Sequence, residues 1–198
     1  MLDEMPATSS FPRTARAASL AAWLTVTAAL ASGQVAGVSN FQKVNDQVYR
    51  GGQPTSDGFK NLAAMGVKTV IDLRLAGEHS LAEEASWVTA DGMRYLSIPL
   101  KGMSAPPEAD VANILSILTD PSAGPVFIHC RRGADRTGTI LACYRISHDH
   151  WENRQALQEA RGLGMSFLER AMQNFVLRFN PGEPKAAASP ATPAAQPQ

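Results

Sequence analysis

Residues 126–138 read Val-Phe-Ile-His-Cys-Arg-Arg-Gly-Ala-Asp-Arg-Thr-Gly. The apolar run at 126–128 follows Gly124-Pro125 and predicts a buried strand, whereas 139–146 has the composition of a buried helix. The polar residues between them therefore form a loop from a strand end to a helix start. Backbone N–H groups converge in such a loop and the helix N-terminus adds partial positive charge, so the loop is suited to bind an oxyanion such as phosphate.

The side chains of this loop have complementary chemistry. Cys130 is the candidate nucleophile, because a helix N-terminus and nearby cations favour the reactive thiolate. Arg136 offers a planar fork of donors that grips two phosphate oxygens, and Thr137 is expected to donate to the sulfur and to cap the helix. His129 is expected to orient the loop. The remaining candidate phosphate-binding residues are Arg131, Arg132, Gly133, Ala134 and Gly138.

The motif at 129–137, His-Cys, five further residues and Arg-Thr, resembles the active-site signature of the protein tyrosine and dual-specificity phosphatase superfamily. Residues 49–54 (Tyr-Arg-Gly-Gly-Gln-Pro) and 66–74 are similar to the opening elements of small bacterial dual-specificity-type phosphatases. The resemblance covers residues 41–179. It implies a phosphomonoester hydrolase with a cysteine nucleophile, a phosphocysteine intermediate and no cofactor.

The resemblance also implies the substrate class, which is phosphotyrosine with activity on phosphoserine and phosphothreonine. Arg131 and Arg132, together with Lys101, predict a cationic pocket mouth, so inositol phosphates or phosphoinositides are the alternative substrates. A phosphate-binding pseudophosphatase is an alternative from another class. The motif contains every residue of the chemical step, which favours an enzyme.

Two positions compete for the general acid that protonates the leaving oxygen. Asp135 precedes Arg136 inside the loop, which resembles the Gly-x-Asp-Arg pattern of myotubularins and of some bacterial phosphatases. Asp110, or Glu108, lies beyond the Gly/Pro-rich segment 101–107, which corresponds to the acid loop of dual-specificity enzymes, but both residues also fit the first turn of a helix. Asp110 is the preferred residue of these two. Asp135 is the preferred acid, with charge pairing to Arg131 or Arg132 as its alternative role.

Upstream, residues 67–73 predict a strand whose end carries Asp72 and Arg74. Ligands of α/β proteins bind at this edge of the sheet, so Arg74 is a candidate for substrate contact. A structural ion pair, with Glu78 as the partner, is the preferred interpretation.

Composition limits the partners. Lys plus Arg equal Asp plus Glu at 18 each, so neither nucleic acid nor an anionic membrane is indicated. The four histidines are dispersed and the two cysteines lack CxxC spacing, so no metal site is predicted. We expect a monomer whose partner is its substrate, a phosphorylated protein or an inositol phosphate. Cys143 is expected to lie in the core.

The chain ends differ in composition from its centre. Arg13 and Arg16 precede an apolar stretch at 17–31, which predicts a signal peptide over 1–33 and therefore export to the periplasm or the medium. An uncleaved membrane anchor and a cytoplasmic protein with an amphipathic N-terminal helix are the alternatives. Residues 34–40 are expected to be a linker, 41–180 the catalytic domain, and the Pro/Ala-rich segment 181–198 a disordered tail.

Strand and helix patterns alternate through the central region, which predicts a single α/β domain of the cysteine-phosphatase type: a mostly parallel central sheet flanked by helices. In the last helix, Phe167, Ala171, Phe175 and Phe179 share one stripe and are expected in the core. Strands are predicted at 44–49, 67–73, 94–98 and 126–128, and helices at 56–65, 81–90, 108–118, 139–146, 152–161 and 167–179.

Overall fold

A computed structural model describes residues 34–182. The predicted signal peptide at 1–33 and all but the first two residues of the predicted tail lie outside this range. Within it, no helix has the length and apolar character needed to cross a membrane.

Five strands form one sheet in the order β1-β2-β5-β3-β4. β1 (Gln42–Lys43) pairs antiparallel with β2 (Val48–Gly51), whereas β3 (Thr69–Asp72), β4 (Arg94–Ser97) and β5 (Val126–His129) make parallel pairs. The prediction of a mostly parallel sheet is confirmed, with an antiparallel edge strand. β5 is paired on both sides and fully buried, which explains its nearly continuous apolar sequence.

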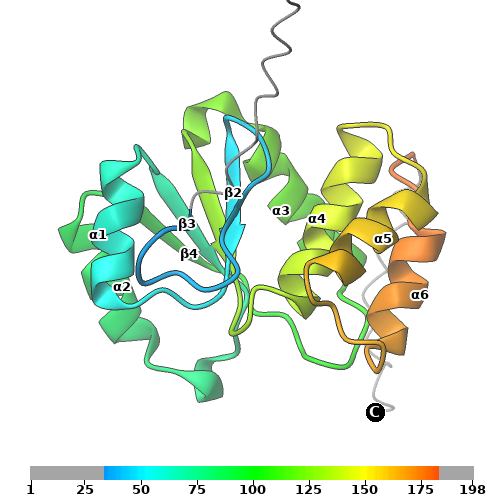
Figure 1. Ribbon diagram of the computed structural model, residues 1–198, viewed down its shortest axis with the longest axis horizontal. Coiled ribbons are helices and arrows are strands. Elements are labelled where there is room, and N and C mark those ends of the chain that lie inside the picture. The colour runs from blue at the N-terminus through cyan, green and yellow to red at the C-terminus, as the bar shows by residue number, and fades with distance from the viewer. Residues whose placement is uncertain (1–33, 183–198) are drawn as a thin grey trace, which may run out of the picture. The chain divides into compact units, whose positions relative to one another are not determined.

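Helices cover both faces of this sheet (Figure 1). The helices α1 and α2 lie on one face, and α3 and α4 lie on the other. The last two helices, α5 and α6, pack on α4. Short 3₁₀ turns, η1 and η2, precede α2 and β5. The helices are α1 (Ser56–Ala64), α2 (Leu81–Ala90), α3 (Glu108–Thr119), α4 (Asp135–Ser147), α5 (Asn153–Gly162) and α6 (Arg170–Arg178), and the 3₁₀ turns are η1 (Ala76–Glu78) and η2 (Pro121–Ala123).

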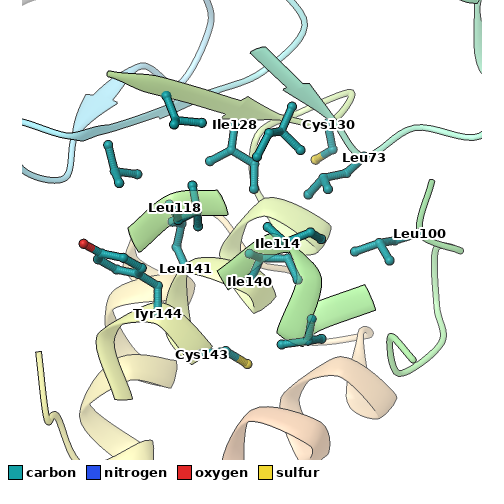
Figure 2. Close-up of a cluster of buried hydrophobic side chains, with 14 of the residues drawn as sticks. Leu73, Leu100, Ile114, Leu118, Ile128, Cys130, Ile140, Leu141, Cys143 and Tyr144 are labelled. Atoms are coloured by element: carbon teal, nitrogen blue, oxygen red, sulfur yellow. The ribbon is translucent and has the colours of Figure 1, made fainter. Parts of the chain in front are cut away.

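Side-chain alternation along β5 divides its residues between the two faces. Ile128 and Cys130 belong to the apolar cluster formed with α3 and α4, as Figure 2 shows. Phe127 belongs to the cluster on the α1–α2 face, and its ring stacks on His129 at a centroid distance of 5.5 Å. The cysteine and the histidine that precedes it therefore face opposite sides of the sheet. Cys143 is buried as expected, and burial raises the pKa of its thiol.

Two predicted helix boundaries were wrong. α4 begins at Asp135, not at 139, so Thr137 lies in its first turn and Ala134 takes the cap position without a side-chain cap. Tertiary packing overrides the weak helix propensity of this polar, Gly-containing turn, because α4 is buried against its neighbours from its second residue onward. α6 begins at Arg170, which leaves Phe167 outside the helix and 77% exposed.

The positive φ of Gly164 (98°) marks the end of α5, and a turn follows before α6. The expected stripe therefore loses Phe167. Phe175 and Phe179 do pack against the core, with ring centroids 6.0 Å apart.

Candidate active site

Cys130 directly follows β5 and is 2% exposed. The strand register places His129 opposite Gly51 on one side and Asp72 on the other. The carboxyl ends of β2, β3 and β5 therefore meet at one edge of the sheet, where α/β proteins bind ligands. Residues 130–134, which we call the phosphate loop, lead from this edge into the N-terminus of α4.

The phosphate loop rests on the segment 49–54. Gly133 has a φ of 67°, and a Cβ at this position would lie 2.2 Å from the carbonyl carbon of Gly51 and 2.4 Å from the amide nitrogen of Gly52. The Gln53 amide donates to the Arg131 carbonyl oxygen at 3.1 Å. The motif at 49–54 is thus the physical support of the loop, and Gly133 is the residue that allows the close approach.

Two side chains hold the Gly133 carbonyl oxygen. Arg50 is 1% exposed and donates to this oxygen from Nη2. Burial lowers the pKa of Arg50 to about 10, although the nearby Glu159 and Cys130 act to raise it. Asn40 donates to the same oxygen at 3.1 Å and to the Leu163 carbonyl oxygen at 3.0 Å. Neither role was predictable from the residue types alone. Arg50 lies in the motif at 49–54, which pointed to this segment as part of the resemblance. Asn40 lies in the expected linker, where no sequence pattern indicated a contact with the loop.

Arg136 forms a bidentate pair with Glu78, with Nη1–Oε1 at 2.5 Å and Nη2–Oε2 at 2.9 Å. Burial opposes the charge of Arg136, but the hydrogen bonds to Glu78 and the proximity of Cys130 raise its pKa. The same hydrogen bonds lower the pKa of Glu78. Glu78 therefore fixes the plane of the guanidinium at the edge that holds Cys130.

The predicted pair of Arg74 with Glu78 was wrong. Arg74 pairs instead with Asp72, at 2.9 Å, and with Glu84, because all three side chains are buried under the sheet edge. His129 Nε2 lies 2.9 Å from Glu84 Oε1. This network contacts the histidine beside the nucleophile, and neither ring nitrogen of His129 makes a hydrogen bond to the phosphate loop among the described residues.

The network also brings together three groups of the kind that bind metal ions. Ligand atoms of Asp72, Glu84 and His129 lie within 4.8 Å of one another, all buried. The guanidinium of Arg74 already pairs with both carboxylates, so the cation that this donor set fits is the arginine.

The polar side chains of the first α4 turn have separate environments. Asp135 accepts a hydrogen bond from the Ser166 amide at 2.8 Å through Oδ1 and pairs with Arg132 through Oδ2. That hydrogen bond raises the pKa of Arg132. The buried Thr137 hydroxyl has no hydrogen-bond partner among the described residues, so the expected donation to the Cys130 sulfur is not made.

The alternative acid lies on another element. Asp110 is in the first turn of α3, where acids are favoured by the helix dipole. Segment 101–107 contains no carboxylate of its own. Arg131 and Lys101 are exposed, and Ala134 is buried.

The fold and the site define a cysteine-dependent phosphatase. A family model described as a DSP-PTPase phosphatase fused to NAD⁺ kinase matches residues 15–177, so the chain belongs to this family of dual-specificity-type phosphatases.

Curated relatives fall into two groups by name. The inositol diphosphatase DSP3 of Arabidopsis thaliana is 29% identical over 147 residues, covering 72% of this chain and 70% of that protein. The dual specificity protein phosphatase TpbA of Pseudomonas aeruginosa is 30% identical over 124 residues, covering 61% of this chain and 52% of that protein. The chain thus spans about half of TpbA.

Solved structures agree on the fold. The crystal structure of P. aeruginosa TpbA has a TM-score of 0.59 at 28% identity, covering 70% of this chain and 83% of that chain. The core catalytic domain of the Saccharomyces cerevisiae phosphatase SIW14, in complex with citrate, has a TM-score of 0.64 at 24% identity, covering 74% and 89%. The similarity to SIW14, at 24% identity, concerns the fold alone.

Proposed function

We propose that this phosphatase hydrolyses phosphomonoesters through Cys130. The thiolate attacks phosphorus, the bond from phosphorus to the leaving oxygen breaks, and that oxygen takes a proton from the general acid. Water then attacks the phosphocysteine, which releases phosphate and regenerates the thiolate. The observation that carries this proposal is the convergence of Cys130, the phosphate loop and the Glu78-oriented Arg136 at one sheet edge.

Arg136 and the loop amides hold the non-bridging oxygens, where charge develops during transfer. The loop amides are those of Arg131, Arg132, Gly133 and Ala134. Gly138 lies in α4 and allows close packing on Met165, whose Cε would lie 3.3 Å from a Cβ at this position. Thr137 assists departure of the thiolate once its hydroxyl rotates toward the sulfur. Asp135 is the proposed general acid, with Asp110 as the alternative.

Protein phosphotyrosine is the proposed substrate, with activity on phosphoserine and phosphothreonine. A structure of P. aeruginosa TpbA with a substitution at its own cysteine was solved in complex with pTyr, and it is 27% identical to this chain. The inositol diphosphatase relatives support the second candidate, an inositol phosphate or phosphoinositide. A pseudophosphatase would bind the same compounds without turnover.

The experiment is release of inorganic phosphate by the full chain under reducing conditions from a phosphotyrosine peptide, a phosphoserine peptide, a phosphoinositide and an inositol pyrophosphate. Cys130→Ser is the test variant. Cys143→Ala is the matched control, since this second cysteine is buried in α4 and is not part of the phosphate loop. Turnover lost only in Cys130→Ser supports the mechanism, and the preferred compound identifies the substrate class. Binding of these compounds without turnover by the unmodified chain would contradict it.

We also propose that the chain is exported after removal of residues 1–33 and acts as a monomer; the composition of the N-terminal segment supports export. N-terminal sequencing of protein recovered from the periplasm or the medium tests cleavage, and sedimentation tests the monomer. A full-length chain that stays with the membrane fraction would indicate the anchor instead.

A further inference from the structure

Two loops that reach the sheet edge holding Cys130 carry large exposed apolar residues. Among the described residues, the three most exposed large hydrophobic side chains are Phe167 (77%), Met103 (73%) and Leu168 (62%). Single exposed apolar residues are ordinary, but exposed apolar side chains gathered beside a functional loop indicate an interaction site. Met103 lies in the loop after β4, and Phe167 and Leu168 lie in the turn between α5 and α6. Both segments reach the same edge as the phosphate loop (Figure 1).

The turn that carries Phe167 and Leu168 is attached to the phosphate loop. The Ser166 amide donates to Asp135, the first residue of α4, at 2.8 Å. Gln173 holds the Ser166 carbonyl oxygen at 2.8 Å. Asn40 joins the Leu163 and Gly133 carbonyl oxygens. Phe167 therefore directly follows a residue whose backbone is hydrogen-bonded to the active-site helix. Its side chain is exposed although the turn that carries it is held in place.

Two of the cations near this turn are compensated, whereas Arg131 and Lys101 are exposed and form no ion pair within the described part of the chain. Arg132 is paired with Asp135, and Glu169 also acts on it. Arg136 is paired with Glu78. A ring carrying many phosphate groups needs several free cations, whereas a single phosphoryl group attached to an apolar body needs the loop, Arg136 and an apolar surface. Phe167 and Leu168 supply the exposed apolar surface that the second kind of ligand needs.

We propose that Phe167 and Leu168 form a specificity surface for the apolar part of the leaving group. The surface binds apolar side chains that flank the phosphotyrosine of a protein substrate, while the phosphate loop binds the phosphoryl group. This inference rests on the proposed phosphatase function and selects one of its substrate classes. The phosphate loop supports this occupant, because the Ser166–Asp135 hydrogen bond holds the turn at residues 165–169 against the first residue of α4, directly after the loop.

The test compares two phosphotyrosine peptides of equal length and charge, one with leucine and valine flanking the phosphotyrosine and one with serine and glycine there. The readout is the ratio of their kcat/KM values in the full chain, in Phe167→Ser/Leu168→Ser and in Leu177→Ser. Leu177 is the matched control, since it is also an exposed leucine (41%) but lies in α6. A general folding defect lowers both kcat/KM values and leaves their ratio unchanged.

We expect the wild-type chain and Leu177→Ser to prefer the apolar peptide about tenfold, through KM, as expected for burial of one or two apolar side chains. The double variant should reduce this ratio to about 1. An unchanged ratio with Cys130-dependent turnover intact would overturn this inference alone, as would an inositol pyrophosphate turned over faster than either peptide. A dimer that the double variant dissociates would overturn it too, by assigning the surface to a second copy. Absence of Cys130-dependent turnover on every compound would instead overturn the proposed function.

Discussion

The Gly133→Ala substitution probes the contact on which the phosphate loop depends. A methyl group at this position would lie 2.2 Å from the Gly51 carbonyl carbon, 2.3 Å from its oxygen and 2.4 Å from the Gly52 amide nitrogen. These are backbone atoms, which cannot rotate away as the end of a side chain can. The loop and the segment 49–54 must therefore separate.

Gly66 offers a matched control for the conformational part of this cost. It has a φ of 91°, but a Cβ there would meet no atom within 4 Å. Gly66→Ala should lower the unfolding free energy by about 1–2 kcal/mol, the cost of a left-handed conformation for an L-residue. Gly133→Ala has the same conformational cost, with a φ of 67°, and adds about 1–3 kcal/mol for overpacking. Its total is about 2–5 kcal/mol.

Chemical denaturation of both variants measures this difference, and phosphate release measures its effect on catalysis. The displaced loop should reduce kcat/KM by about 100-fold, since a misplacement on the order of 1 Å has that effect on a positioned reaction. Gly66→Ala should keep wild-type activity, because the residue lies in the turn after α1. Equal stability losses in the two variants, with Gly133→Ala fully active, would refute the close approach of the loop to residues 51–52.

Two substitutions test supports of the site, and one labelling experiment tests the core. Arg136 lowers the pKa of Glu78, so the pair stabilises the fold fully above the unfolded pKa of about 4.3 and less as the pH falls through the folded pKa. The stability difference between wild type and Glu78→Gln should therefore vanish in acid. Denaturation at several pH values measures it. Asn40→Gly tolerates the positive φ of 49° but loses the side-chain hydrogen bonds, so it should lower the unfolding free energy by about 1–3 kcal/mol in the same assay. Cys143, whose pKa burial raises, should resist iodoacetamide in the folded protein and react after denaturation, as mass spectrometry can show.

The features that the sequence predicted correctly depend on local patterns. The β-rich run before Cys130 and the glycines and prolines between elements indicated the alternating order, and the predicted helix at 81–90 has the bounds of α2. The residues from Cys130 to Gly138 form the loop and helix start in chain order. Apolar periodicity and turn residues act over a few positions, so one sequence is enough to locate them.

The features that the sequence did not predict depend on contacts between distant segments. Glu78 reaches Arg136 across 58 positions, and Asn40 reaches Gly133 across 93. Arg74 had acids on both sides in sequence, and only the fold shows that Asp72 and Glu84 share its burial. Phe167 matched a helical stripe, but Ser166 is held by Asp135, and the helix starts after the turn that this bond fixes.

The general-acid role that we propose for Asp135 competes with its structural contacts for the same two oxygens. In this conformation both oxygens accept hydrogen bonds, from Ser166 and from Arg132, whereas a proton donor needs one oxygen directed at the leaving group. Substrate phosphate can resolve the conflict by drawing Arg132 away from Oδ2, so that binding itself frees the acid. We therefore propose that Asp135 becomes available as a proton donor only when substrate is bound.

This mechanism separates Asp135 from Asp110 by their dependence on the leaving group. p-Nitrophenolate leaves without much help from an acid, whereas an alkyl oxygen must be protonated, so Asp135→Asn should reduce kcat about 10²–10⁴-fold on a phosphoserine peptide and much less on p-nitrophenyl phosphate. Asp110→Asn should reduce neither. Equal losses on both substrates, reproduced by Arg132→Ala, would show that Asp135 positions Arg132 and donates no proton. The leaving-group dependence appearing in Asp110→Asn instead would move the acid to α3, and the hydrogen bond from Ser166 to Asp135 would then serve only to hold the turn that carries Phe167.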